Sequence, residues 1–259
     1  MVGEDVISST ASTAYARPLT QPSSESRRDI CLGLLRGFEL RSAEGVGHVP
    51  ISAQRLLAFL ALHDRPLQRT YVAGALWLKQ SEEQGQACLR SALWRLSRHG
   101  WRLIDARVRD LQLLPTIQVD YRLATATARR IVGDCDESHR EDVEQLIRAG
   151  DLLPDWYDDW VMIERERLRQ LRLRALEVLC RRLTAAGMFG PAVEAGLAAV
   201  LGEPLRESAQ RVLIEAHLAE GNRSEAIRQY NVYRVRLHSE LRLEPSPELR
   251  RLVLDGAGP

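Results

Sequence analysis

Apolar positions in the first part of the chain follow a strand-like and then a helical pattern. Residues 30–42, ICLGLLRGFELRS, alternate and contain glycine and β-forming residues, which predicts one or two short strands. Apolar residues then recur at helical spacing up to Pro66, where a helix has to end. We therefore expect a helix with Ser52 as its N-cap. Its apolar stripe consists of Leu56, Leu57, Leu60 and Ala61.

Two more helices and a hairpin are predicted farther along. The segment RTYVAGALW indicates a short second helix with Thr70 as its cap. Ser81 and Gln84 have the spacing of a capping box, so a third helix should open there and run to about Arg98. Residues 101–114 then alternate around a polar centre, which predicts a β-hairpin.

Beyond Leu123 the pattern is helical throughout. Ser138 and Glu141 are again spaced as a capping box. A long helix is expected over residues 160–186, and Ser246 is placed to cap a last helix.

An internal repeat of 34 residues follows the long helix. Each unit has a glycine before a helix start, with Pro191 at the first helical position in one unit and Asn222 with Glu225 as a capping pair in the other. Such a period, with small residues where paired helices approach, is typical of tetratricopeptide-type repeats. The corresponding pairs are Gly187 and Gly221, Leu179 and Leu213, Ala192 and Ala226, and Val193 and Ile227.

The order of strand, three helices and hairpin is that of a winged helix. We predict a mainly α fold with small β elements, in which an N-terminal winged helix-turn-helix precedes a tetratricopeptide-like all-α domain. The expected division is a tail over residues 1–29, the winged helix over 30–123 and the helical domain over 124–259. The tail is expected to be disordered because it is rich in Ser, Thr, Ala and Pro and poor in large apolar residues.

The distribution of charge is more informative than the net charge of +1. Residues 30–125 hold 13 Lys or Arg and eight Asp or Glu, whereas residues 126–259 hold 20 and 23. A basic first half suits a polyanion binder joined to another module, although ordinary two-domain proteins are often as asymmetric. Every cation except Lys79 is an arginine, so phosphate contacts would be guanidinium forks.

The outward face of the third helix supplies candidate DNA contacts, because this helix of a winged helix enters the major groove. Arg90 and Arg95 are placed to reach guanine or phosphate, and Gln84 and Ser91 to reach base edges. The remaining candidates are Trp94 on the same face, Arg98 and Arg102 for the DNA backbone, Arg69 and Thr70 for a phosphate at the second helix's N-terminus, and Arg107 and Arg109 at the hairpin tip for the minor groove.

Each of these residues has a less specific interpretation. An arginine on an amphipathic helix is most often solvated or salt-bridged, and Trp94 is as well explained by packing under the hairpin. Glu82 and Glu83 would repel phosphate, but they also suit the positive end of the helix dipole. Only the combination of helix, hairpin and local charge favours DNA binding.

Catalysis, metal binding and membrane insertion have little support in the sequence. The four cysteines lack metal-binding spacing, the six histidines form no i, i+4 pair, and no nucleophile constellation is evident. We therefore expect no enzymatic activity, no cofactor and no metal. The lack of a long apolar run or a signal peptide predicts a soluble, cytoplasmic protein.

The stretch DWYDDW is interpreted as a packed corner, with solvated Asp155, Asp158 and Asp159 beside Trp156, Tyr157 and Trp160.

The sequence resembles the Streptomyces antibiotic regulatory protein (SARP) family of bacterial transcriptional activators over residues 30–254. The similar stretches in the first half include LLRGFEL, AQRLLAFLALH, ALW and CLRSALWRLSR. DLLPDWYDDWVMIERERLRQLRLRALEVL, AAGMFGPAVEAG and LIEAHLAEGNRSEAIRQYNVYRVRLHSELRLEPSPELRRL are similar to the bacterial transcriptional activator domain. The chain departs from the family at WLKQ, where relatives often have Trp-Pro and an acidic residue. It also has no P-loop, so we expect it to correspond to a short form without the ATPase module.

The resemblance implies a recognition helix over residues 81–98 and a wing over 103–113. It further implies binding to direct repeats at promoters as a homodimer, and recruitment of RNA polymerase with its sigma factor. The expected outcome is activation of a secondary-metabolite (antibiotic) gene cluster in the bacterial cytoplasm, at the nucleoid. The alternative is a helical-repeat scaffold for protein–protein interaction whose winged helix does not bind DNA.

Overall fold

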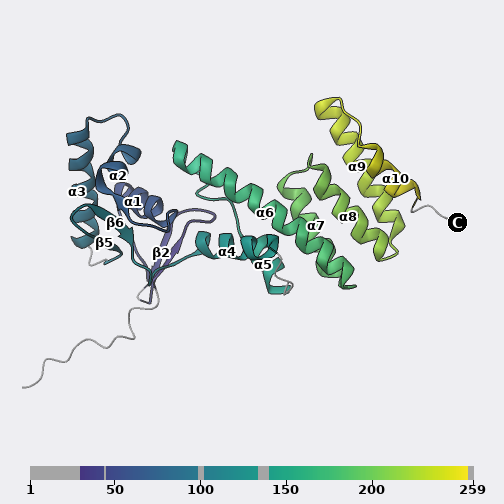
Figure 1. Cartoon of the computed structure of the whole chain (residues 1–259), viewed down its shortest axis with the longest axis horizontal. Coiled ribbons are helices and arrows are strands. Elements are labelled where there is room, and N and C mark those ends of the chain that lie inside the picture. Colours follow the sequence, from purple (N-terminus) through teal and green to yellow (C-terminus); the bar gives the residue numbers. More distant parts are fainter. Residues whose placement is uncertain (1–29, 44, 99–101, 134–139, 256–259) are drawn as a thin grey trace, which may run out of the picture.

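The computed structural model describes residues 30–43, 45–98, 102–133 and 140–255. They form a winged helix at one end of an elongated molecule and a row of antiparallel helices toward the other (Figure 1). The mainly α fold with small β elements is thus confirmed. Three predictions concern residues outside these ranges: the disordered tail over 1–29, the capping role of Ser138 and the start of the hairpin at Trp101.

A four-stranded sheet brings the first apolar residues into the core. Its order is β3-β2-β1-β7, and only β1 and β7 pair in parallel. Leu32 lies opposite Leu40 in the β1–β2 register, and both are buried. The alternation predicted one or two short strands here, and the structure has two. The strands are β1 Cys31–Gly33, β2 Glu39–Ser42, β3 Gly45–Val46 and β7 Gln118–Val119.

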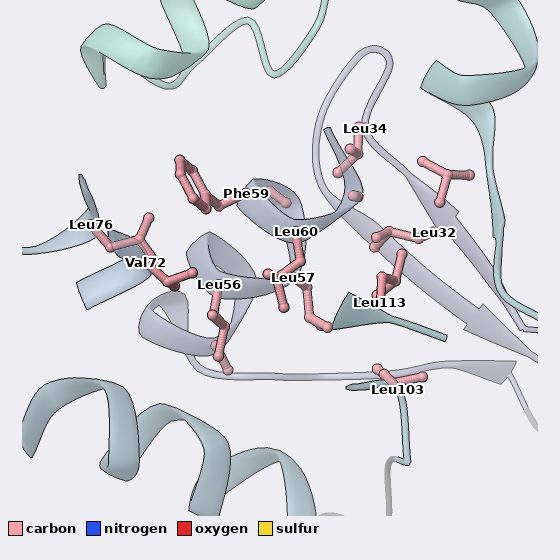
Figure 2. Packing of buried hydrophobic residues seen from close by; sticks show 14 of the residues in the cluster. Leu32, Leu34, Leu56, Leu57, Phe59, Leu60, Val72, Leu76, Leu103 and Leu113 are labelled. Carbon is pink, nitrogen blue, oxygen red and sulfur yellow. The ribbon is translucent and has the colours of Figure 1, made fainter. Parts of the chain in front are cut away.

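Three helices share one apolar core with this sheet. The side chains of Leu56, Leu57 and Leu60 point from α1 into the cluster beside strand β1 and helix α2 (Figure 2). Together with Ala61, which is also buried, these residues are the predicted apolar stripe, and the structure confirms it. The helices are α1 Ile51–Ala61, α2 Arg69–Leu76 and α3 Glu82–Arg98.

The predicted N-caps of α1 and α2 are wrong. Each helix begins one residue before the expected cap, because Pro50 and Gln68 already have the extended backbone that precedes a helix. Neither Ser52 nor Thr70 therefore caps its helix. The Ser52 hydroxyl instead accepts a hydrogen bond from the Arg95 guanidinium at 3.4 Å.

A second, three-stranded sheet contains the predicted hairpin. Its order is β4-β6-β5, and all pairs are antiparallel. Leu111 and Leu113 of the hairpin are buried, whereas Arg107, Val108 and Arg109 at its tip are exposed. The hairpin is therefore confirmed, with its inner face on the core. The strands are β4 Leu67–Gln68, β5 Ile104–Ala106 and β6 Asp110–Leu113.

The second half is an all-α array in which α6 pairs with α7 and α8 with α9 (Figure 1). Gly187 and Gly221 have φ of 72° and 84°, left-handed values that suit glycine in the turn before each second helix. The 34-residue repeat is therefore confirmed as two helical pairs. None of the described helices is long and apolar enough to cross a membrane. The helices are α4 Asp120–Val132, α5 Arg140–Arg148, α6 Asp159–Ala185, α7 Phe189–Gly202, α8 Glu207–Ala219, α9 Arg223–Leu241 and α10 Pro247–Asp255.

Two of the helix starts predicted for this half need correction. Helix α7 begins at Phe189, so Pro191 is its third residue. Asn222 precedes α9, but its side chain caps no backbone N–H and Glu225 pairs with Arg228 instead. The cap of α10 is as predicted, since the Leu249 N–H donates to Ser246 Oγ at 3.2 Å.

The first core is completed by residues from beyond the predicted domain boundary at 123/124. Leu152, Leu153 and Val161 are fully buried in the same apolar cluster as the winged helix. Trp160 also joins it, with its ring edge-on to Phe59 at a centroid distance of 5.2 Å. The boundary itself falls inside α4 and stays a prediction.

The DWYDDW stretch forms this junction. Trp156 is half-buried and stacks on Phe38 at 6.2 Å, so the packed corner predicted for its tryptophans is confirmed. Tyr157 does not belong to it, because this side chain is 81% exposed. The Arg165 guanidinium donates to three backbone carbonyls of the loop before α6, those of Leu152, Leu153 and Trp156.

Asp120 fixes the start of α4 to the first sheet. Its carboxylate accepts hydrogen bonds from the backbone N–H groups of Leu34, Leu35 and Tyr121 at 2.8, 3.0 and 2.6 Å. Burial raises the pKa of this carboxyl, and the three hydrogen bonds oppose that effect. Helix α4 packs in turn along α6, so it links the sheet to the helical half.

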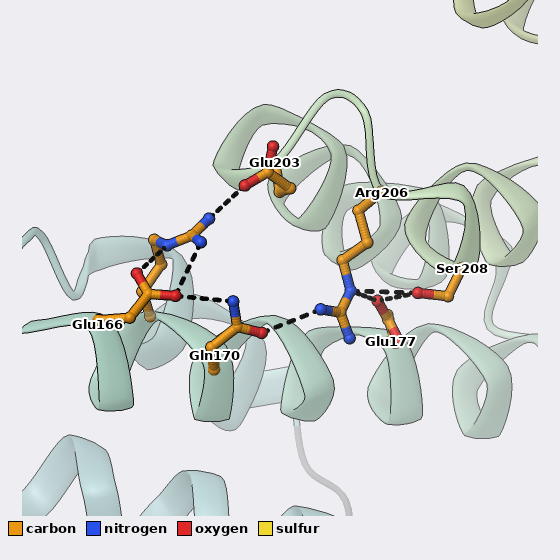
Figure 3. A network of polar contacts seen from close by, with 7 residues as sticks. Glu166, Gln170, Glu177, Glu203, Arg206 and Ser208 are labelled. Atoms are coloured by element: carbon orange, nitrogen blue, oxygen red, sulfur yellow. Dashed lines mark hydrogen bonds and ion pairs between the residues drawn. The ribbon is translucent and has the colours of Figure 1, made fainter. Parts of the chain in front are cut away.

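A polar network ties α6 to the turn between α7 and α8 (Figure 3). Glu177, 4% exposed, accepts from Arg206 at 2.5 Å and from Ser208 at 2.8 Å. Arg206 also donates to Gln170 at 3.1 Å. A buried carboxylate is tolerated here because hydrogen bonds and a guanidinium replace its water.

Candidate nucleic-acid interface

Helix α3 has one face fixed by the core and the opposite face free. Leu89, Ala92 and Leu96 are at most 3% exposed and pack toward α1 and α2. Gly85, near the start of the helix, is buried where an added Cβ would lie 3.6 Å from the Ala73 carbonyl oxygen. This close approach sets the position of α3 on α2. The face of α3 opposite to Gly85 and the buried leucines therefore points outward.

The outward face of α3 carries the predicted set of cationic, polar and aromatic residues. Trp94 is 57% exposed, and the Arg98 guanidinium lies 5.1 Å from its ring centroid. The interpretation of Trp94 as packed under the hairpin is therefore wrong. The exposed predicted residues of this helix are Gln84, Arg90, Ser91, Trp94, Arg95 and Arg98.

The arginines of this face have no acidic partner in the part of the chain that the structure describes. No carboxylate of those residues lies within 4.0 Å of Arg90, Arg95 or Arg98. Glu82 and Glu83 lie in the first turn, where they suit the helix dipole. The face therefore keeps a local excess of positive charge that phosphate would neutralise.

The capping box at the start of α3 is confirmed. The Gln84 N–H donates to Ser81 Oγ, and the Ser81 N–H donates to Gln84 Oε1, both at 3.3 Å. The oxygen of the Gln84 amide is thus used within the helix, whereas its NH₂ group donates to no described residue. Gln84 remains exposed.

Loss of this cap has a measurable consequence. Ser81→Ala is expected to lower the free energy of unfolding by about 1 kcal/mol, because an N–H of the first turn loses its partner. Urea denaturation followed by circular dichroism measures the change. Ser97→Ala is the matched control, since Ser97 only bonds back to the Leu93 carbonyl within α3. Equal stability of the two variants would contradict a role for the box.

The base of the wing is fastened to α2 by Arg69. Its backbone N–H donates to the Arg109 carbonyl at 2.9 Å, and its Nε donates to the Arg107 carbonyl at 3.1 Å. Arg69 is half-buried in this arrangement, whereas Thr70 is exposed beside it. The structure therefore gives Arg69 a bracing role that the sequence did not predict.

The wing tip brings two of the predicted cations together. Arg107 pairs with Asp105 of its own hairpin at 3.0 Å, which offsets part of its charge. Arg109 is exposed, and so is Arg102, which precedes β5. Neither arginine forms an ion pair with a described residue. Val108 between the two tip arginines is 93% exposed, an apolar tip residue that sequence reasoning missed. In the sequence, the position of Val108 between two arginines in a predicted hairpin turn indicates an exposed tip residue.

The described residues contain no group of three or more His, Cys, Asp or Glu side chains arranged to hold a metal ion. Cys88 of α3 is half-buried and unbridged. The chemistry of this surface is accordingly that of guanidinium groups, short polar side chains and one exposed indole.

Comparison with known proteins finds similarity to a family model and to solved structures. Residues 133–254 match the family model of the bacterial transcriptional activator domain. Among solved structures, the chain is similar to Mycobacterium tuberculosis EmbR in complex with a low affinity phosphopeptide, with a TM-score of 0.68 and 20% identity. The match covers 88% of this chain and 65% of that chain, and at this identity it shows a shared fold. No curated protein matches the sequence.

Proposed function

We propose that this protein is a transcriptional regulator of the SARP type, which activates transcription from promoter DNA that it binds through α3 and the β5–β6 hairpin. In this proposal α3 lies in the major groove and the wing tip in the adjacent minor groove. The observation that carries the proposal is the outward face of α3, where arginines and Trp94 are exposed and lack carboxylate partners among the described residues.

The arrangement of the surrounding elements supports this reading. Helix α3 and the wing lie together at the end of the molecule away from α7 to α10 (Figure 1). Arg90, Arg95 and Arg98 are available for guanine edges or phosphates, and Ser91 lies among them on the helix surface. Arg102 and Arg109 extend the same positive surface to the wing.

Arg95→Ala tests the groove face directly. Because its only described hydrogen bond is an exposed one to Ser52, the thermal midpoint should stay nearly unchanged. Affinity for a cognate operator should fall by about 1–3 kcal/mol if Arg95 contacts a base, or about fivefold to 150-fold. Fluorescence anisotropy with labelled operator measures this at several salt concentrations. If Arg95 contacts a phosphate instead, the slope of log affinity against log salt concentration (the salt slope) should become smaller by about one.

Arg234→Ala on α9 is the control for a general loss of positive charge. Arg234 is exposed, far from the winged helix, and makes no described ion pair. Its affinity and salt slope should match those of the unmodified protein. Operator binding by Arg95→Ala that equals this control would show that the groove face is placed wrongly.

The operator needed for these measurements comes from immunoprecipitation of the tagged protein from its native host, with sequencing of the bound DNA. Sharp promoter peaks that share a direct repeat are the expected result.

We further propose homodimers on that repeat, recruitment of RNA polymerase with its sigma factor, and control of a secondary-metabolite (antibiotic) cluster at the nucleoid. We assign the protein no catalytic role.

A protein–protein interaction scaffold is the second candidate, and the stacked pairs α6–α7 and α8–α9 favour it. No enriched DNA from a folded, expressed protein would contradict DNA binding and support the scaffold. Retention on a random-DNA column at low salt separates the two functions cheaply.

A further inference from the structure

Arg55 of α1 connects three elements that are distant in sequence. Its guanidinium donates to the Leu76 carbonyl at the end of α2, at 2.9 Å, and to the Asp158 carboxylate before α6, at 2.5 Å. The two side chains are only 26% and 27% exposed, so solvent screens their attraction incompletely. One arginine thus joins the winged helix to the first turn of the long helix of the helical half.

Asp158 is positioned to cap its own helix but does not. It is the N-cap residue of α6, where Asp ordinarily accepts from a backbone N–H of the first turn. Here its side chain makes no cap hydrogen bond and is directed to Arg55 instead. Only its backbone carbonyl serves α6, accepting from Val161 and Met162 at 2.9 and 3.0 Å. The carboxylate therefore has an alternative partner, the N-terminus of α6, whenever Arg55 is released.

The end of α2 determines where α3 begins. Leu76 is the last residue of α2, and its carbonyl lacks a continuing helical turn because Trp77 leaves the helix with φ −126° and ψ 51°. Arg55 supplies the missing donor. Five residues later Ser81 opens α3, whose Gly85 packs directly against the Ala73 backbone of α2. A shift of α2 at this end is therefore transmitted to the N-terminal half of α3.

We propose that the Arg55–Asp158 ion pair is a positioning contact through which the helical domain sets the placement of the recognition helix. The proposal rests on the proposed function of α3 in DNA binding. The pair holds α2 and α6 together while the carboxylate leaves its capping site empty. Any partner or movement that draws the start of α6 away would loosen the end of α2 and lower operator affinity.

Asp158→Ser tests the contact with little harm to α6. Serine is a good N-cap, so the helix keeps its start, but its side chain is too short to reach Arg55. In the DNA-free protein, backbone amides of residues 76–81 are expected to exchange with deuterium about three- to tenfold faster. Operator affinity is expected to fall by a similar factor, because the recognition helix must be reordered on binding.

Glu203→Gln provides the matched control. It breaks the Arg169–Glu203 ion pair, which has the same 2.5 Å distance and comparable exposure, 33% and 36%, but lies within the helical domain. This variant should leave both operator affinity and exchange at residues 76–81 unchanged. A general effect of losing one partly exposed ion pair would appear equally in both variants.

Arg55→Met and the double variant complete a cycle. If the two residues act through one contact, the double variant should lose no more affinity than the weaker-binding single variant. Two results would overturn the proposal. Faster exchange with unchanged affinity would show that the pair has only a structural role. Reduced affinity with unchanged exchange would show that the pair does not act through the end of α2. Binding by none of the proteins, the unmodified chain included, would contradict the proposed function instead.

Discussion

A chain ended at Leu123 is expected not to fold into a DNA-binding winged helix, although the sequence pattern places the domain boundary there. Leu152, Leu153, Val161 and Leu168 close the first core from the other side of that boundary, each at most 5% exposed. Loss of one buried leucine side chain costs about 2–5 kcal/mol, while a whole domain is stable by only about 5–15 kcal/mol. Removing three such leucines together with Val161 therefore exceeds what the remaining core can sustain.

Two measurements check this expectation. Circular dichroism of residues 30–123 should show no cooperative thermal transition, and its affinity for operator should fall to the level of nonspecific binding. A longer chain ended at Arg174 is the control, because it retains the closing residues and the first half of α6. A cooperative transition and full affinity for residues 30–123 would show that the winged helix folds alone and that the shared core is dispensable.

The elements that form the candidate interface are predictable because their determinants are close together in the sequence. Ser81 and Gln84 lie three residues apart and form the predicted capping box. Leu89 and Leu96 lie two turns apart and fix which face of α3 is buried, so the exposed face follows by exclusion. The hairpin follows in the same way from alternation over neighbouring positions.

Contacts between distant segments are not predictable in this way. The Leu153 N–H donates to the Leu34 carbonyl at 2.9 Å, and Arg55 pairs with a carboxylate 103 residues away. No local spacing encodes either contact, since each depends on how α6 is carried back to the winged helix. Arg69 shows the same limit, because its position at a helix start suggested a phosphate ligand while its wing contacts are long-range.

Helix starts form an intermediate case. Ser52 and Thr70 are good capping residues by type, yet each helix begins one residue earlier. The side-chain preference for capping is worth about 1 kcal/mol, which tertiary packing of the apolar stripe easily outweighs. A cap is therefore predicted most safely where two residues reinforce each other, as at the start of α3.

Gly196→Val is expected to lower the free energy of unfolding by about 3 kcal/mol, through overpacking where α6, α7 and α8 meet. An added Cβ would lie 3.1 Å from Leu213 Cδ1, 3.2 Å from Cys180 Sγ and 3.2 Å from Leu213 Cα. The last is a backbone atom of α8, which cannot move aside as the end of a flexible side chain does. The two γ-methyl groups of valine extend farther, so the helices must separate. The denaturant midpoint measures the loss.

Gly190→Ala in the same helix separates overpacking from the ordinary effect of replacing a glycine. A Cβ at Gly190 has nothing within 4 Å, so this variant is expected to gain up to about 1 kcal/mol from the lower entropy of its unfolded chain. Tyr230 occupies the position equivalent to Gly196 in the 34-residue repeat, so the second pair already accommodates a large side chain there. The second unit therefore lacks the tight approach found at Gly196. An unchanged midpoint for Gly196→Val would mean that α7 and α8 do not touch at this point, and the two helical pairs would then lack the close stacking that the repeat predicts.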